Sequence, residues 1–124
     1  MTAGDPHRAQ QEFAPLLAAE RATLLGLVDS LLAQRDSIAE SSALSSGDDE
    51  HDPEGATLAY ERAQVLSLLA ETRRELDDLD RATERLASGT YGHCLRCGRL
   101  IPGERLTARP AATTCVGCAD RIRR

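Results

Sequence analysis

The sequence predicts an all-α protein, in which a long antiparallel helical hairpin of the coiled-coil type precedes a small C-terminal module built around four cysteines. The apolar residues of the 124-residue chain are mainly leucine and alanine, and its aromatic residues are one phenylalanine and two tyrosines. That composition is typical of packed helices more than of sheets. Two stretches repeat apolar residues every seven positions, and all four cysteines lie near the C-terminus.

The N-terminal residues 1–14 are polar and weakly patterned, and we expect them to lie outside the hairpin. Asp5 and Pro6 could start a short helix there, because aspartate caps helix N-termini and proline suits the first helical position. Pro15 should interrupt a longer helix, since proline lacks an N–H and is comfortable only in the first turn. The main first helix is therefore predicted to begin near Pro15.

The first long helix is predicted from one apolar stripe that continues to residue 38. Its residues recur every seven positions, with one valine at the complementary seam position, which is the pattern of a coiled coil. The stripe consists of Leu17, Leu24, Val28, Leu31 and Ile38, and it is widened by Leu25 and Leu32. Residues 41–51 then gather serines, acids and a glycine, which favour a reversal of the chain.

A second helix is predicted to start at Asp52, which can cap it, with Pro53 at the first helical position and Glu54 in the first turn. It is predicted to stop at Ser88 and Gly89. Its seam again repeats every seven residues and consists of Leu58, Val65, Leu69, Thr72, Leu76, Leu79 and Leu86. Two such seams joined by about ten residues fold back as an antiparallel hairpin.

The predicted reversal of the hairpin is strongly acidic. Residues 47–55 carry five acidic side chains. We therefore expect the hairpin of residues 15–89 to present an acidic tip. The second helix would be about 50 Å long at the usual helical rise.

Residues 90–124 form the predicted cysteine module. The spacing of its cysteines indicates a four-cysteine zinc finger, and we expect a short helix at its C-terminal end. Two C-x2-C pairs stand seventeen residues apart, namely Cys94 with Cys97 and Cys115 with Cys118. Each pair can place two sulfurs on one ion from a tight turn, and Gly98 and Gly117 would allow the positive φ values that such turns often need. Four protein ligands leave no open position, so a single structural Zn²⁺ is predicted. Two disulfides or four free thiols are the alternative, and a redox-sensing role would belong with that alternative.

The composition argues against several classes of function. The sequence has no phosphate-binding glycine loop, no nucleophile elbow and no serine or cysteine with a plausible histidine and acid, so we expect no enzyme. It has no signal-peptide pattern and no apolar run of about 18 residues, which predicts a cytoplasmic protein away from membranes. Residues 1–93 carry 8 arginines and 18 acids, whereas residues 94–124 carry 7 arginines and 2 acids. This mixed charge suggests a protein partner more than a bare nucleic acid.

The hairpin followed by the stretch YGHCLRCGRLIPGERLTARPAATTCVGC resembles the DksA/TraR zinc-finger family of bacterial transcription regulators. The most specific marks are the seventeen-residue gap between the cysteine pairs and the R-L-x-A-R-P stretch of residues 105–110. The resemblance covers roughly residues 15–124. It implies a regulator that inserts its hairpin through the secondary channel of RNA polymerase, places tip acids near the catalytic Mg²⁺ and binds no specific DNA sequence.

The family resemblance also implies which tip residues would act on the polymerase. Counted back from Cys94, the family's acidic tip pattern falls on residues 51–56, where Glu54 and Ala56 match in kind. The first acid of the pattern falls on His51, and Asp52 stands one place later as a substitute. We expect a tip formed by these residues together with the neighbouring acids, which gives the set Asp48, Asp49, Asp52, Glu54 and Ala56. Helix capping and loop solubility would explain Asp52 and Glu54 without any partner.

Some members of the family bind the alarmone guanosine tetraphosphate with basic residues near the hairpin base. Arg109 matches one of these positions and is a candidate contact to phosphate or to a partner. Two further basic positions fall on Asp78 and Ala119, and an acid facing a pyrophosphate would repel it. We therefore expect weak or absent alarmone dependence.

Two other functions remain open from the sequence. The chain could be a zinc-stapled helical adaptor that holds another protein through its helical faces or its basic tail, in which case the tip charges would be dispensable. The arginine-rich C-terminus could instead bind nucleic acid, with an affinity that falls steeply with salt.

Overall fold

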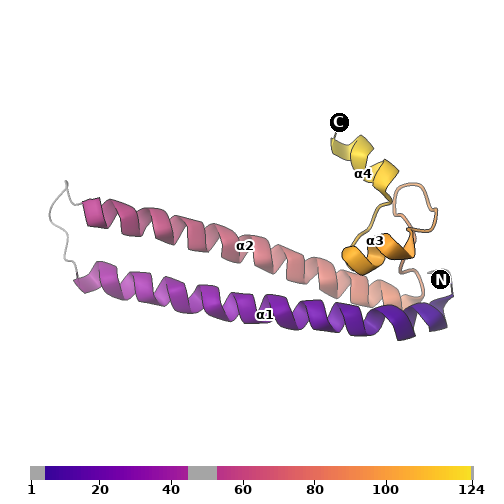
Figure 1. Cartoon of the computed structure of the whole chain (residues 1–124), viewed down its shortest axis with the longest axis horizontal. Helices are drawn as coiled ribbons and strands as arrows, with labels where there is room; N and C mark the ends of the chain where they lie inside the picture. The colour runs from indigo at the N-terminus through magenta and orange to yellow at the C-terminus, as the bar shows by residue number, and fades with distance from the viewer. Residues whose placement is uncertain (1–4, 45–52, 124) are drawn as a thin grey trace. The chain divides into compact units, whose positions relative to one another are not determined.

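The computed structural model describes residues 5–44 and 53–123 of the chain. These residues form the helices α1 (Pro6–Leu44), α2 (Pro53–Ser88), α3 (Gly103–Ala108) and α4 (Val116–Arg123), which are labelled in Figure 1. The described part contains one isolated antiparallel bridge, between His93 and Leu100, and no longer strand. The predicted all-α class is confirmed. The chain divides into two compact units, residues 23–75 and residues 1–22 with 76–124.

Helix α1 begins at Pro6, so the prediction that the main first helix begins near Pro15 was wrong. Asp5 caps the helix, because its Oδ1 accepts hydrogen bonds from the backbone N–H groups of His7 at 3.1 Å and Arg8 at 3.4 Å. Pro15 lies inside the helix, where it costs roughly 3 kcal/mol through its missing N–H and its ring clash. Burial of Phe13, which is 2% exposed, offsets part of that cost. Residues 6–14 are therefore part of the first helix.

The unit of residues 23–75 is the part of the hairpin next to the reversal, and its helices pack through the predicted seam. Leu31 and Ile38 of α1 form a buried cluster with Val65 and Leu69 of α2. The partly buried side chains that complete this cluster are Val28, Leu32 and Leu58. Each large aliphatic side chain that leaves water contributes about 1.5–3 kcal/mol, so this seam supplies most of what pairs the two helices here.

In the other unit, the seam continues through Leu17 of α1 and Leu79 and Leu86 of α2, which are all at most 4% exposed. An ion pair joins Arg21 Nε to Asp80 Oδ1 at 2.9 Å across the two helices. Both side chains of this pair are about half exposed, so it contributes less than about 1 kcal/mol. Apolar burial therefore holds the helices together in this unit as well.

Helix α2 ends at Ser88, as predicted, because the next residue adopts a left-handed conformation. Gly89 has φ +81°, which favours glycine over residues with a side chain. The backbone N–H groups of Thr90 and Tyr91 then both donate to the carbonyl oxygen of Arg85, at 2.9 and 3.2 Å. These bonds close the helix end and direct the chain into the cysteine module. In residues 5–44 and 53–123, no helix combines the length and the apolar character that crossing a bilayer requires.

Candidate metal centre

The first cysteine pair lies in a tight loop that is closed by the bridge between His93 and Leu100. The backbone N–H of Cys94 donates to the carbonyl oxygen of Arg99 at 2.8 Å, and the N–H of Gly98 donates to that of Cys94 at 2.9 Å. Gly98 has φ +77°, as the sequence predicted for this turn. The loop thereby directs the sulfurs of Cys94 and Cys97 to the same side.

The second pair lies where α4 begins, and here the structure departs from the sequence prediction. Cys118 is in the first turn of α4, and the backbone N–H of Ala119 donates to the carbonyl oxygen of Cys115 at 2.9 Å. Gly117 is itself helical and has no positive φ, so the prediction that this turn needs a left-handed glycine was wrong. A helical turn already brings residues three apart onto one face, which is sufficient to pair the two sulfurs.

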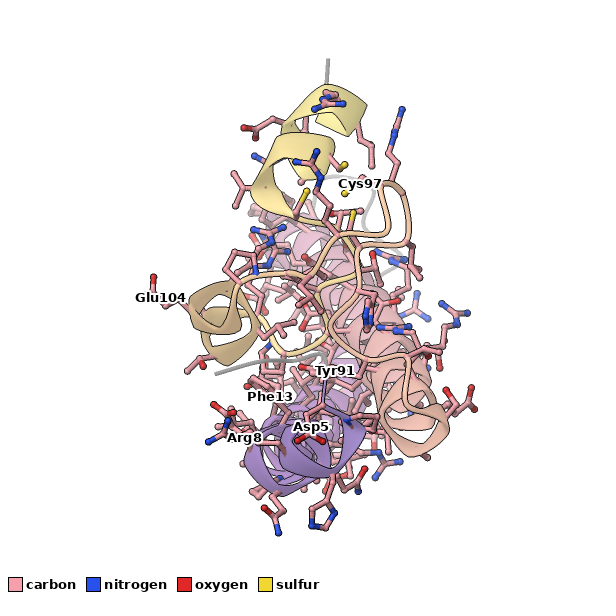
Figure 2. All side chains as sticks on the ribbon, turned by 90° about the vertical axis from the view of Figure 1, so that its right-hand side faces the viewer. Asp5, Arg8, Phe13, Tyr91, Cys97 and Glu104 are labelled. Atoms are coloured by element: carbon pink, nitrogen blue, oxygen red, sulfur yellow. The ribbon has the colours of Figure 1, made fainter. Side chains whose placement is uncertain are left out.

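The two pairs meet, and their four sulfur atoms lie within 4.8 Å of one another. Figure 2 shows these atoms gathered beside the labelled Cys97. The sulfurs of Cys97 and Cys115 are 3.9 Å apart, close to the roughly 3.8 Å that a tetrahedron with Zn–S bonds of about 2.3 Å requires. A backbone hydrogen bond of 2.8 Å from Leu95 N–H to the carbonyl of Thr113 ties the two loops together. The four cysteines are therefore positioned to bind a single metal ion, and Zn²⁺ fits this donor set.

Backbone donors and mutual hydrogen bonds distribute charge unevenly over the sulfurs. The N–H groups of Cys97 and Cys115 lower the pKa of Cys94 to about 6, and burial opposes them. Hydrogen bonding to Cys115 and burial raise the pKa of Cys118 to about 12. A divalent cation favours the deprotonated form of all four cysteines, because its charge stabilises the thiolates. That is the contribution Zn²⁺ makes when bound. The residues themselves fill every ligand position, so the site suits a structural ion.

A small apolar core supports the metal centre from the side of the hairpin helices. The rings of Phe13 and Tyr91 are 5.3 Å apart between centroids, and both are 2% exposed; Figure 2 shows them labelled. Ile101 and Leu106 belong to the same unit and are almost fully buried as well. Sequence reasoning missed the role of the two aromatic residues, although their rarity in this chain was an available signal.

Polar contacts fix the R-L-x-A-R-P stretch of residues 105–110 to the same core. The hydroxyl of Tyr91 donates to the carbonyl oxygen of Pro110 at 2.6 Å, and Arg105 Nε donates to that of Thr114 at 2.9 Å. Arg109 follows α3 and is exposed, so its side chain is accessible for the predicted phosphate or partner contact. The stretch therefore has a structural role, since it connects the buried tyrosine to the loop before the second cysteine pair.

Burial raises the pKa of Tyr91 to about 12, and the nearby Arg85 guanidinium acts in the opposite direction. A phenol in the unfolded chain ionises near pH 10, so the stability that the neutral phenol contributes is complete below pH 10. It is lost as the pH rises to about 12. We expect Tyr91→Phe to lower the free energy of unfolding by about 1 kcal/mol at neutral pH, through the lost bond to Pro110. The difference should shrink between pH 10 and 12, because the variant has no phenol to ionise.

Urea unfolding of the zinc-loaded protein at pH 7 and pH 11 measures this effect. A Tyr60→Phe variant serves as the control, because it removes an exposed tyrosine and leaves Tyr91 as the one phenol of the chain. Its ultraviolet absorbance during alkaline titration then reports Tyr91 alone. Parallel pH profiles for the wild type and Tyr91→Phe would contradict the assignment.

The predicted tip residues fall only partly within the described structure. Asp48, Asp49 and Asp52 lie outside the described residues. Glu54 and Ala56 lie in the first turn of α2, and both are exposed. The carboxylate of Glu54 is thus at the positive end of the helix, where a negative charge is favourable. The described residues do not bring the tip set together as a site.

The fold and the metal centre define a class of protein, namely a helical hairpin that carries a small C-terminal four-cysteine zinc finger. The model of the prokaryotic dksA/traR C4-type zinc finger matches residues 89–124. The structure of the transcription factor DksA2 from Pseudomonas aeruginosa is similar over 99% of this chain and 90% of that one, with a TM-score of 0.78 and 31% sequence identity. The chain therefore belongs to the DksA/TraR family, as the resemblance predicted.

Curated relatives match over shorter stretches. The protein YteA of Bacillus subtilis strain 168 is 41% identical over 66 residues, which are 53% of this chain and 28% of that protein. The RNA polymerase-binding transcription factor DksA of Caulobacter vibrioides is 35% identical over 69 residues, which are 56% of this chain and 49% of that protein. The matched stretch thus spans less than half the length of each of these relatives.

Proposed function

We propose that this protein is a transcription regulator that binds RNA polymerase. The observation that carries the proposal is the similarity to the transcription factor DksA2, which extends over 99% of this chain and includes both the helical hairpin and the cysteine module. A second relative is named as an RNA polymerase-binding transcription factor, and it matches 56% of this chain. A likeness in both parts of the chain supports a shared mode of action better than a zinc finger alone would.

The proposed mechanism uses the acidic reversal of the hairpin. The cluster that contains Leu31 and Leu69 pairs α1 with α2 in the part of the hairpin nearer the reversal. Glu54 is exposed in the first turn of α2, next to the acids at positions 48, 49, 50 and 52 of the sequence. We infer that a narrow helical pair enters the secondary channel and that its carboxylates act electrostatically near the catalytic Mg²⁺.

The regulator is proposed to act without recognising a DNA sequence. Residues 1–93 carry 18 acids and 8 arginines, and this part of the chain would be repelled by a phosphate backbone. Asp78 is exposed on α2 and accepts a 3.4 Å hydrogen bond from Arg81, where a basic residue would be needed to hold an alarmone phosphate. We therefore also propose that the transcriptional effect depends little on guanosine tetraphosphate.

The test compares binding and transcription for a variant with a neutral tip, Asp52→Asn with Glu54→Gln. We expect this variant to copurify with RNA polymerase nearly as well as the wild type. In a purified transcription assay, its effect on initiation should be at least about tenfold smaller than that of the wild type. The reason is that these substitutions remove two charges and keep the size and shape of the side chains. The matched control is Glu20→Gln with Asp29→Asn, which removes two exposed charges from α1 and should change the effect little.

Three outcomes would contradict the proposal in different ways. A protein that does not associate with polymerase would refute the partner. A neutral-tip variant with full transcriptional activity would refute the mechanism and favour the adaptor function. Salt-sensitive binding to DNA in the absence of polymerase would favour nucleic-acid binding by the arginine-rich C-terminus.

A further inference from the structure

We propose that the hairpin contains a stretch of low local stability at Gly26 of α1 and Thr72 of α2, which we call the soft layer. The two helices separate there locally more often than in the neighbouring parts of the hairpin. Leu31 and Leu69 belong to one buried cluster and define which parts of the helices face each other. About one helical turn further from the reversal, α1 reaches Val28 and Gly26, and α2 reaches Thr72. Gly26 and Thr72 therefore weaken neighbouring parts of the same antiparallel pair.

Thr72 weakens the seam because it occupies an apolar position with a polar side chain. It is 4% exposed and is the buried polar side chain among the described residues. Its hydroxyl donates to the carbonyl oxygen of Leu68 at 2.7 Å, so this bond stays within α2. A hydroxyl bonded back to its own helix slightly destabilises that helix and often bends it. The side chain also offers the seam one methyl group where Leu69 and Leu79 each offer two.

Gly26 weakens the facing part of α1 because a glycine in a helix interior favours the unfolded chain. Neither packing nor backbone geometry requires glycine here. A Cβ at this position would meet no atom within 4 Å, and φ is not positive. The position is also exposed, so an alanine would be accommodated without any rearrangement.

The soft layer lies close to one limit of the unit of residues 23–75. The division between the two compact units falls between residues 22 and 23 on α1 and between residues 75 and 76 on α2. Both points are about one helical turn from Gly26 or Thr72. Two independent weaknesses thus lie in one short stretch of the hairpin, close to the limit of the unit of residues 23–75, and local opening concentrates where stabilising contacts are fewest.

A layer that opens locally would let the part of the hairpin near the reversal adjust when it enters a confined site. That consequence rests on the proposed function, whereas the soft layer itself is a property of the free protein. Its test therefore measures hydrogen exchange without polymerase, so a failed transcription assay and a failed exchange experiment remain distinguishable.

The experiment is hydrogen exchange with mass spectrometry on the full, zinc-loaded chain, comparing the wild type with Gly26→Ala and with Thr72→Val. In the wild type we expect amides around residues 24–28 and 70–74 to exchange faster than those of the Leu31 and Leu69 cluster. Gly26→Ala should slow exchange in the soft layer by about two- to fivefold, since alanine favours the helix. Thr72→Val should slow it by a similar factor, because a second methyl group enters the seam.

Matched controls separate a local effect from general stabilisation. Ser37→Ala raises the helix propensity at an exposed position of α1 that lies outside the soft layer. Thr83→Val removes a hydroxyl with the same type of bond, to the carbonyl of Leu79 at 2.9 Å, from an exposed position of α2. Neither control should slow exchange around Gly26 and Thr72. Exchange in the wild-type layer no faster than in the cluster, or equal slowing by the controls, would overturn the proposal.

Discussion

Replacing Cys94 by serine, or removing zinc with a chelator, is expected to unfold the module that contains residues 90–123. A four-thiolate zinc site supplies an apparent free energy of about 10–16 kcal/mol in zinc-finger peptides. The module has few other sources of stability, because α3 has six residues and its apolar core consists of a handful of side chains. Serine preserves the size of the side chain and removes the thiolate, so the loss of the metal bond dominates the result.

Limited trypsin digestion measures this unfolding well, because residues 94–124 contain seven arginines. With zinc bound, the sites within the module should be protected, and they should be cut rapidly after chelation or in Cys94→Ser. The matched control is Leu95→Ser, which changes an exposed residue of the same loop and leaves all four sulfurs in place. Circular dichroism should show that most of the helical signal, which α1 and α2 supply, remains in both variants. Equal protection with and without zinc would show that the module folds independently of the metal.

The second large effect is expected from Phe13→Ala. Phe13 is 2% exposed and its ring centroid is 5.3 Å from that of Tyr91, so truncation removes the aromatic contact and leaves a cavity. Such truncations typically lower the free energy of unfolding by about 3–5 kcal/mol. Because Tyr91 is anchored to Pro110 through its hydroxyl, the cavity should also loosen the loop that leads to the second cysteine pair.

Urea unfolding of the zinc-loaded protein, followed by circular dichroism, measures the stability change. Transfer of zinc to a coloured chelator measures the looser loop, and we expect faster transfer from Phe13→Ala than from the wild type. Tyr60→Ala is the control, since it truncates an aromatic side chain that is 65% exposed and should change stability by less than about 0.5 kcal/mol. Similar stabilities for the two variants would exclude Phe13 from the core.

The seam and the metal site could be predicted because both depend on local spacing. A repeat of seven residues places Leu17 and Leu31 on one side of α1, and the same repeat places Leu79 on the seam side of α2; all three are buried in the structure. Paired cysteines similarly converge on one ion through short turns. The end of α2 at Ser88 and Gly89 was equally predictable, because glycine adopts the required positive φ.

The start of α1 and the aromatic core could not be predicted by the same reasoning. The rule that proline ends a helix is a local preference, and at Pro15 its cost is offset in part by the burial of Phe13, whose partner Tyr91 is far away in the sequence. No periodic pattern connects two such positions. At Gly117 a local rule predicted a feature that the structure does not contain. A glycine within a C-x2-C pair suggested a left-handed turn, but the first turn of α4 brings the sulfurs of Cys115 and Cys118 together without one.

The unit around the metal centre is built from two stretches that are far apart in the sequence, and this affects the order in which the chain folds during synthesis. This unit joins residues 1–22 to residues 76–124, whereas the other unit is the continuous stretch 23–75. The continuous stretch has all its contacts available early in translation, and contacts between distant residues form more slowly. Phe13 therefore meets its aromatic partner Tyr91 only after residues 23–75 have been synthesised. We expect the unit that contains the metal centre to complete its folding after the continuous one.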